Sequence, residues 1–149
     1  MFNVFNVFKK TRMVIAVGLL AALLAACGGG GGGGKTGDSG SVAESIKSAI
    51  AAVPGVADVE ARYNVNKGMG STLSVRIEAE AGTTSLEPVM TDSLRAFSGA
   101  VADISGLNSA MGISFQVTEL GHENTINPTA VGLPQRPTIP EIAEFAAQN

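Results

Sequence analysis

Acid–base or metal chemistry in this chain would have to involve His122, its only histidine, which has Glu123 beside it. A histidine can act as a general base, and a His–Glu pair can supply half of a metal site. Adjacent loop residues rarely converge on one atom without further ligands, so we interpret both as part of a solvated polar loop. The sequence has no second cysteine for redox chemistry and no serine in a nucleophile elbow. We therefore expect a protein that is not an enzyme and that holds no metal or other cofactor.

Charged side chains form a second group, on two consecutive segments in which apolar and polar residues alternate. Its members are Asp58, Glu60, Arg62, Arg76, Glu78 and Glu80. Alternate residues of a strand share a face, so all six are predicted on one side of a hairpin. We interpret this side as a solvated sheet face with cross-strand ion pairs worth about 0–1 kcal/mol each. A binding patch is the alternative. Under the solvated interpretation, any assembly contact is expected at the sheet edges or helix flanks.

The only cysteine, Cys27, closes an apolar segment near the start of the sequence. The segment consists of the basic residues Lys9, Lys10 and Arg12, the apolar run Val14 to Leu24 and the small residues Ala25 and Ala26. This order is typical of a secretory signal, here residues 1–26, which is removed on export. An uncleaved transmembrane helix is the alternative, but the apolar run is shorter than the roughly 20 residues that spanning requires.

The run Leu24-Ala25-Ala26-Cys27 resembles the lipobox of bacterial lipoproteins. The resemblance implies a lipid thioether on Cys27, cleavage before this residue, and acylation of the new amino group. The mature protein would then be anchored in the cell membrane or the outer membrane and face the extracytoplasmic or periplasmic side. The residue after the cysteine is Gly28 and not aspartate. In a cell with two membranes, this resembles the pattern of lipoproteins that are sorted to the outer membrane. In a cell with one membrane, it is uninformative.

Residues 27–40 are predicted to be a lipidated cysteine followed by a tether, because Gly28 to Gly34 is an unbroken glycine run. As a flexible chain it would span about 20 Å, and fully extended about 45 Å. Removal of residues 1–26 takes away three of the ten Lys and Arg residues and none of the thirteen Asp and Glu residues. The mature chain would therefore have seven basic and thirteen acidic residues, a net charge of about −6. An acidic surface disfavours nucleic acid as a partner.

A first helix is predicted from Ser41, which forms a capping-box pattern with Glu44, to Pro54-Gly55. Its apolar stripe consists of Val42, Ile46, Ala49, Ile50 and Val53. Two alternating segments then predict an antiparallel hairpin. Their inward residues are Ala57, Val59, Ala61, Tyr63 and Val65, then Leu73, Val75, Ile77, Ala79 and Ala81.

A second helix is predicted after Thr84 or Ser85 as N-cap, and a third strand follows it. The helix has the stripe Leu86, Met90, Leu94, Phe97, Val101 and Ile104, and the strand has Ile113, Phe115 and Val117 facing inward. We expect Phe97 to be buried against Val75 or Ile77.

These elements predict an α+β fold, an open-faced αββαβ sandwich over residues 41–120 with two helices on one face of a three-stranded sheet. A right-handed crossover places the third strand parallel to the second, with the first expected between them. Residues 121–149 are expected to be a proline-containing tail, in which Thr138-Ile139-Pro140-Glu141 can cap a short helix.

The stretch Ile46 to Val59, with Pro54-Gly55-Val56 at its centre, resembles the helix–turn–strand corner of heavy-metal-associated domains. The resemblance implies a ferredoxin-like layout. The Cys-x-x-Cys pair and the first strand of that family are missing, so thiolate metal binding is rejected. The order of elements also resembles the ring-building modules of secretion and sporulation assemblies, some of which are lipoproteins.

Three functions fit the sequence. The first is a lipid-anchored, non-enzymatic envelope module that binds another protein. The second is a subunit of a ring or oligomer, formed by self-association of the αββαβ unit. The third is an enzyme or solute-binding protein that uses His122 and the acidic face.

Overall fold

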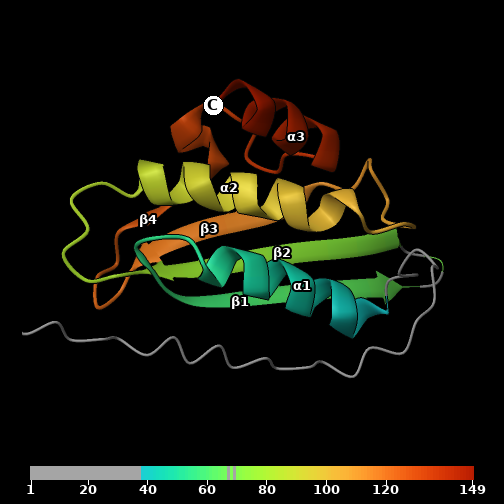
Figure 1. The fold of residues 1–149 in the computed structure, drawn as a ribbon, viewed down its shortest axis with the longest axis horizontal. Coiled ribbons are helices and arrows are strands. Elements are labelled where there is room, and N and C mark those ends of the chain that lie inside the picture. The colour runs from blue at the N-terminus through green and yellow to red at the C-terminus, as the bar shows by residue number, and fades with distance from the viewer. Residues whose placement is uncertain (1–37, 67, 69) are drawn as a thin grey trace, which may run out of the picture. The chain divides into compact units, whose positions relative to one another are not determined.

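The computed structural model describes residues 38–66, 68 and 70–149, which form a mixed four-stranded sheet and three α-helices (Figure 1). The elements are α1 (Ser39–Ala51), β1 (Val56–Asn66), β2 (Gly70–Ala79), α2 (Glu87–Ala102), β3 (Ile113–Glu119), β4 (Thr125–Ile126), a 3-10 turn η1 (Pro128–Val131) and α3 (Ile139–Gln148). The α+β class is confirmed. The expected three strands and two helices are each one too few, because β4 and α3 belong to the same fold.

The strands lie in the order β1-β2-β3-β4, with β1 antiparallel to β2 and β2 parallel to β3. The parallel pairing of the second and third strands is confirmed. The expectation that the first strand lies between them is wrong. The tight hairpin places β1 along one side of β2, and the crossover through α2 delivers β3 to the other side. β1 is consequently an outer strand of the sheet.

Helices α1 and α2 cover one face of the sheet, and α3 packs on α2 on the side away from α1 (Figure 1). The apolar residues of β2 point into this interface, and those predicted from Leu73 to Ala79 are all buried. Ala81 lies beyond the end of β2 and is exposed, contrary to its predicted inward position. The opposite face of the sheet is not covered by any of the described helices.

The residues of β1 depart from strict alternation at its start, where a bulge lies between Val56 and Asp58. Ala57 is the extra residue and is exposed, so its predicted inward orientation is wrong, and Val56 packs on the core instead. Val59 and Tyr63 are buried as predicted, whereas Val65 is 54% exposed. The bulge follows Pro54 and Gly55, whose φ of 82° is accessible to glycine at little cost.

Helix α1 begins three residues earlier than predicted, because its N-cap residue is Asp38 and not Ser41. Ser41 lies inside the first turn and its Oγ donates to the Asp38 carbonyl at 2.9 Å, so the predicted capping box with Glu44 does not form. Val42, Ile46 and Ile50 are buried as predicted. The stripe therefore determines which face of α1 packs, although the cap is placed differently.

Helix α2 supplies the centre of the core. Its N-cap residue is Leu86, rather than Thr84 or Ser85. Met90, Leu94 and Phe97 are fully buried, and Val101 is nearly so. Phe97 meets Phe115 of β3 edge to face, with ring centroids 5.9 Å apart and planes at 88°. Such aromatic pairs stabilise a fold by about 0.5–1.5 kcal/mol beyond the contribution of the apolar area that they bury.

The segment 121–149 is part of this fold and not a separate tail. β4 pairs with β3, the Pro137 carbonyl accepts the amide of Ile113 at 2.9 Å, and Ile142 of α3 is fully buried in the common core. The predicted cap of the last helix is present. Thr138 donates through its amide (2.7 Å) and its Oγ (2.8 Å) to the Glu141 carboxylate.

The core predicts a large effect of Phe97→Ala. Truncating a fully buried phenylalanine removes its apolar contacts and leaves a cavity beside Phe115, so the free energy of unfolding should fall by about 3–5 kcal/mol. Urea denaturation measures this loss. Phe145→Ala, at a partly buried position of α3, is the control and should cost less. Equal losses would mean that α2 is not the central element.

The cap of α3 predicts a pH-dependent effect of Glu141→Gln. Hydrogen bonds from the Thr138 amide and then its hydroxyl hold the pKa of Glu141 below its ordinary value of 4.5. The ionised form therefore stabilises the folded state above that value, and this contribution is lost as the pH falls through the lowered folded-state pKa. The variant should melt below wild type at neutral pH, and the gap should narrow in acid. Glu144→Gln on the same helix should show no such narrowing.

Candidate functional site

The uncovered face of the sheet carries three polar rows that run across the strands. They are Asp58–Glu78–Thr118, Glu60–Arg76–Gln116 and Arg62–Ser74–Ser114, each joining directly paired residues of β1, β2 and β3. Five of the six charged residues predicted to share a face do so. Glu80 lies just beyond β2 and is exposed. The neutral β3 members of the rows were not singled out from the sequence, because serine, threonine and glutamine are ordinary on a wet strand face.

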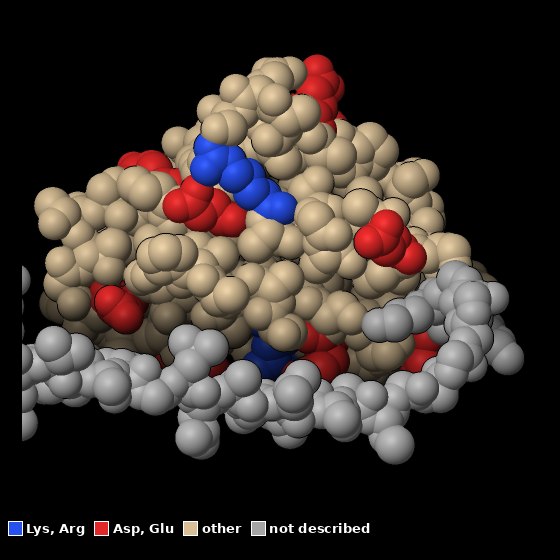
Figure 2. All heavy atoms as spheres, viewed as in Figure 1, with Lys and Arg blue, Asp and Glu red and all other residues tan. Residues whose placement is uncertain are grey.

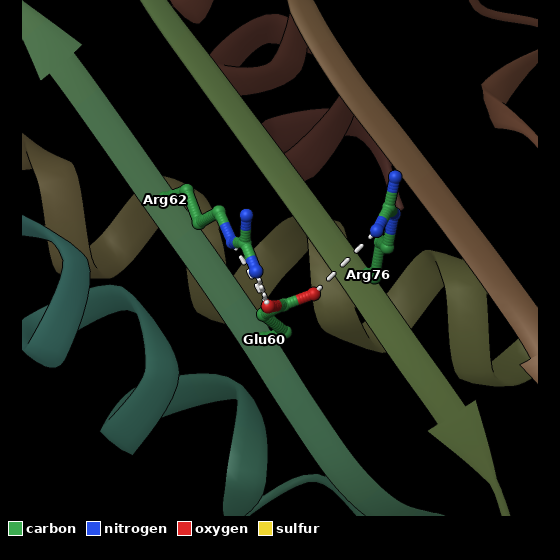
Figure 3. A network of polar contacts seen from close by, with 3 residues as sticks. All are labelled: Glu60, Arg62 and Arg76. Carbon is green, nitrogen blue, oxygen red and sulfur yellow. Dashed lines mark hydrogen bonds and ion pairs between the residues drawn. The ribbon is translucent and has the colours of Figure 1, made fainter.

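Glu60 is the centre of an ionic network on this face (Figure 3). Its Oε1 accepts from the Nε of Arg62 at 2.9 Å, and its Oε2 lies 3.6 Å from an Arg76 guanidinium nitrogen on the neighbouring strand. The side chains of Arg62 and Arg76 are 66% and 69% exposed. Exposed pairs of this kind contribute about 0–1 kcal/mol each, so the network orients charges more than it stabilises the fold.

Asp58 and Glu78 lie directly opposite each other, and both are exposed. Like charges at directly paired positions are destabilising. Among the described residues, neither carboxylate takes part in an ion pair. The first row is therefore a site of negative charge, next to the charge-balanced row of Glu60 and Arg76.

A shallow depression of about 540 Å³ adjoins this acidic end of the face. It is lined by Glu44 and Lys47 of α1, by Asp58, Val59, Glu60 and Ala61 of β1, and by Arg76 and Glu78 of β2. The lining is mixed in charge and comes from both the helix layer and the outer strand. The depression therefore lies at the β1 side of the fold, where a partner could contact α1 and the strand together.

The helix-covered side differs from the polar sheet face. Figure 2 shows mostly uncharged surface there, with scattered acidic groups and with basic atoms that adjoin acidic ones. Arg95 of α2 pairs at 2.6 Å with Asp92 of the same helix, and it also donates to the backbone oxygen of Asn149 at the end of α3. This contact has a structural role because it holds the end of α3 against α2.

His122 and Glu123 lie on the loop after β3 and are exposed. The nearest carboxylate to His122 is that of Glu119, with Nε2 and Oε1 3.8 Å apart, and the same Oε1 accepts the Gly82 amide at 2.9 Å. Glu119, which the sequence analysis did not single out, thus connects β3 to the turn after β2. Within residues 38–66, 68 and 70–149 no cluster of His, Cys, Asp and Glu is arranged to hold a metal.

Cys27, the signal pattern and residues 27–37 of the predicted tether lie outside the described residues, so the lipid attachment remains a prediction. The predicted end of the tether at residue 40 is wrong, because Ser39 and Gly40 belong to α1. In the part of the chain that the structure describes, no helix has the length and apolar character to cross a membrane.

No known protein-family model matches this sequence, and no curated protein sequence is similar to it.

The opposed carboxylates predict that Glu78→Lys raises stability. The substitution replaces a like-charge pair with Asp58 by an opposite-charge pair, which should add up to about 1 kcal/mol to the free energy of unfolding. Glu80→Lys, which makes the same charge change outside the strand, is the control. Denaturant titration at low salt compares the two. Equal gains would show that the overall charge matters and not the pairing.

Proposed function

We propose that the protein is a lipid-anchored, extracytoplasmic lipoprotein, a non-enzymatic binding or assembly module of the cell envelope. The observation that carries the proposal is Cys27, which ends a signal-like segment and follows Leu24-Ala25-Ala26. Lipid at this cysteine would anchor the chain in the cell membrane or the outer membrane. Two or more acyl chains are needed for stable anchoring, which lipidation of both the thiol and the new amino group would supply.

The position of the first helix supports this arrangement. α1 begins at Ser39, so residues 28–38, with the glycine run among them, separate its start from Cys27. A glycine-rich flexible chain of this length would span about 17–20 Å. The folded residues could therefore stand clear of the lipid headgroups while remaining attached, and the net negative charge would favour this separation at an anionic surface.

The binding role is proposed for the polar face and the β1 side of the sheet. These surfaces offer directional groups in a fixed register, namely the Glu60 network and the acidic pair of Asp58 and Glu78. A protein partner can match such an arrangement through complementary charge, which contributes specificity. Nucleic acid does not fit an acidic mature chain.

The second candidate function is a subunit of a larger envelope assembly built from copies of this chain. The observation that favours it is the outer position of β1, which with eleven residues is the longest strand. Long outer strands pair readily with further strands.

The anchor predicts the behaviour of Cys27→Ser. Serine cannot form the lipid thioether, so metabolic labelling with a radioactive fatty acid should be abolished, and the chain should accumulate unprocessed or be released from the membrane. Gly28→Ala, beside the acceptor, should keep the label. Normal processing and membrane retention of Cys27→Ser would contradict the lipoprotein proposal.

A further inference from the structure

The outer edge of β1 is the least protected backbone in the sheet. β1 runs for eleven residues, and no described strand pairs with its outer side, whereas the opposite edge of the sheet is the two-residue β4. An outer strand presents a row of unpaired amide and carbonyl groups. Short strands, prolines, bulges and charged side chains are the usual protections. β4 is short, and β1 carries charged side chains.

The backbone of β1 is irregular only at its beginning. The bulge at Ala57 interrupts the pairing there, but from Asp58 to Asn66 the register with β2 is continuous, and the strand contains no proline. The depression between α1 and the strand reaches Asp58 to Ala61, so α1 leaves this side accessible. Val65, more than half exposed, lies further along the same strand. A nine-residue stretch is therefore available to pair with another strand.

The charges on this stretch are complementary to those on the same stretch of a second, antiparallel copy. On the uncovered face, Glu60 and Arg62 are consecutive, one on each side of Ala61. If a second β1 runs antiparallel with Ala61 opposite Ala61, then Glu60 of each copy lies opposite Arg62 of the other. Centring the pair on Glu60 or on Arg62 instead places two like charges opposite each other, which is unfavourable.

We propose that two copies of this chain associate through their β1 edges, antiparallel and with Ala61 on the two-fold axis, to form one continuous eight-stranded sheet. Residues that oppose each other in antiparallel strands point to the same face, so both copies keep their helices on one side. With this centre, Asp58 to Asn64 of each copy pair with each other, and Val65 lies just beyond the paired length, beside the bulge of the second copy. The interface is isologous, as in most closed dimers.

This inference names the partner for the proposed assembly role and in that sense rests on the proposed function, but it depends on the β1 edge and not on lipid. Anchoring would assist it, because two tethered chains in one membrane meet at a raised effective concentration.

The test uses the full mature protein, extracted in detergent, and two charge-reversed variants, Glu60→Lys and Arg62→Glu. In a dimer of either variant alone, both ion pairs across the axis become like-charge pairs, so dimerisation should weaken by about tenfold or more. In an equimolar mixture, the new lysine of one copy faces the new glutamate of the other, and the native Arg62 faces the native Glu60. The mixture should therefore form dimers with one copy of each, which native mass spectrometry distinguishes by mass.

Glu80→Lys is the matched control, since it makes the same charge change at an exposed residue just beyond β2, outside the paired length of β1. It should keep the wild-type dimer. Melting curves of all variants check that each is folded, and only pairing between copies explains recovery in the mixture of two folded variants.

Three results would overturn the inference: a monomeric wild-type protein, a mixture that stays as monomeric as its components, or equal disruption by Glu80→Lys. Fatty-acid labelling of the same samples separates the two proposals. A labelled monomer would leave the anchor standing without the dimer, and an unlabelled dimer would leave the edge pairing standing without the anchor.

Discussion

The packing of α2 across the parallel β2–β3 pair is the interaction on which the rest of the structure depends. Phe97 meets Phe115 there, and Leu94 and Met90 fill the space beside them without exposure to solvent. Parallel strands cannot be joined by a tight turn, so the covering helix is also the connection between them. β1 pairs with the edge of β2 that faces away from β3. α1 covers β1 on the same face of the sheet as α2. The three polar rows on the uncovered face take their positions from this register.

The sequence is sufficient to predict those parts of the fold that depend on periodicity. The four-residue and three-residue steps from Leu86 to Ile104 specify a helix face, and the alternation around Val75 and Phe115 specifies strand faces. Strand order is different, because both positions beside β2 satisfy the same local pattern and only long-range packing chooses between them. The bulge at Ala57 is also invisible to the pattern, since an inserted residue of small size breaks alternation without breaking composition. Docking of α3 depends on Ile142, with Ile139 and Phe145 packed against the same core, and three apolar residues in a short terminal segment do not distinguish a docked helix from a frayed one.

The candidate site could likewise be predicted only where it depends on periodicity. That Glu60, Arg62 and Arg76 share a face could be predicted from alternation, because each strand was assigned correctly. Their connection through one carboxylate required the register between β1 and β2, which depends on the hairpin and the bulge. The role of Glu119 could not be predicted, because its partners Gly82 and His122 come from different loops. The outer position of β1 followed only from the strand order, although its charges were plain in the sequence.

The burial of Ile142 has a consequence for the timing of folding. This residue belongs to the same core as Val42, at the other end of the described chain, so the core is incomplete until nearly all of it is available. The β2–β3 pairing likewise waits for the residues after α2, and contacts of such sequence separation form late. A nascent chain would therefore stay open while it is being made. For a protein proposed to cross a membrane before it folds, late closure of the core is itself an aid to export, because no early compact state has to be undone.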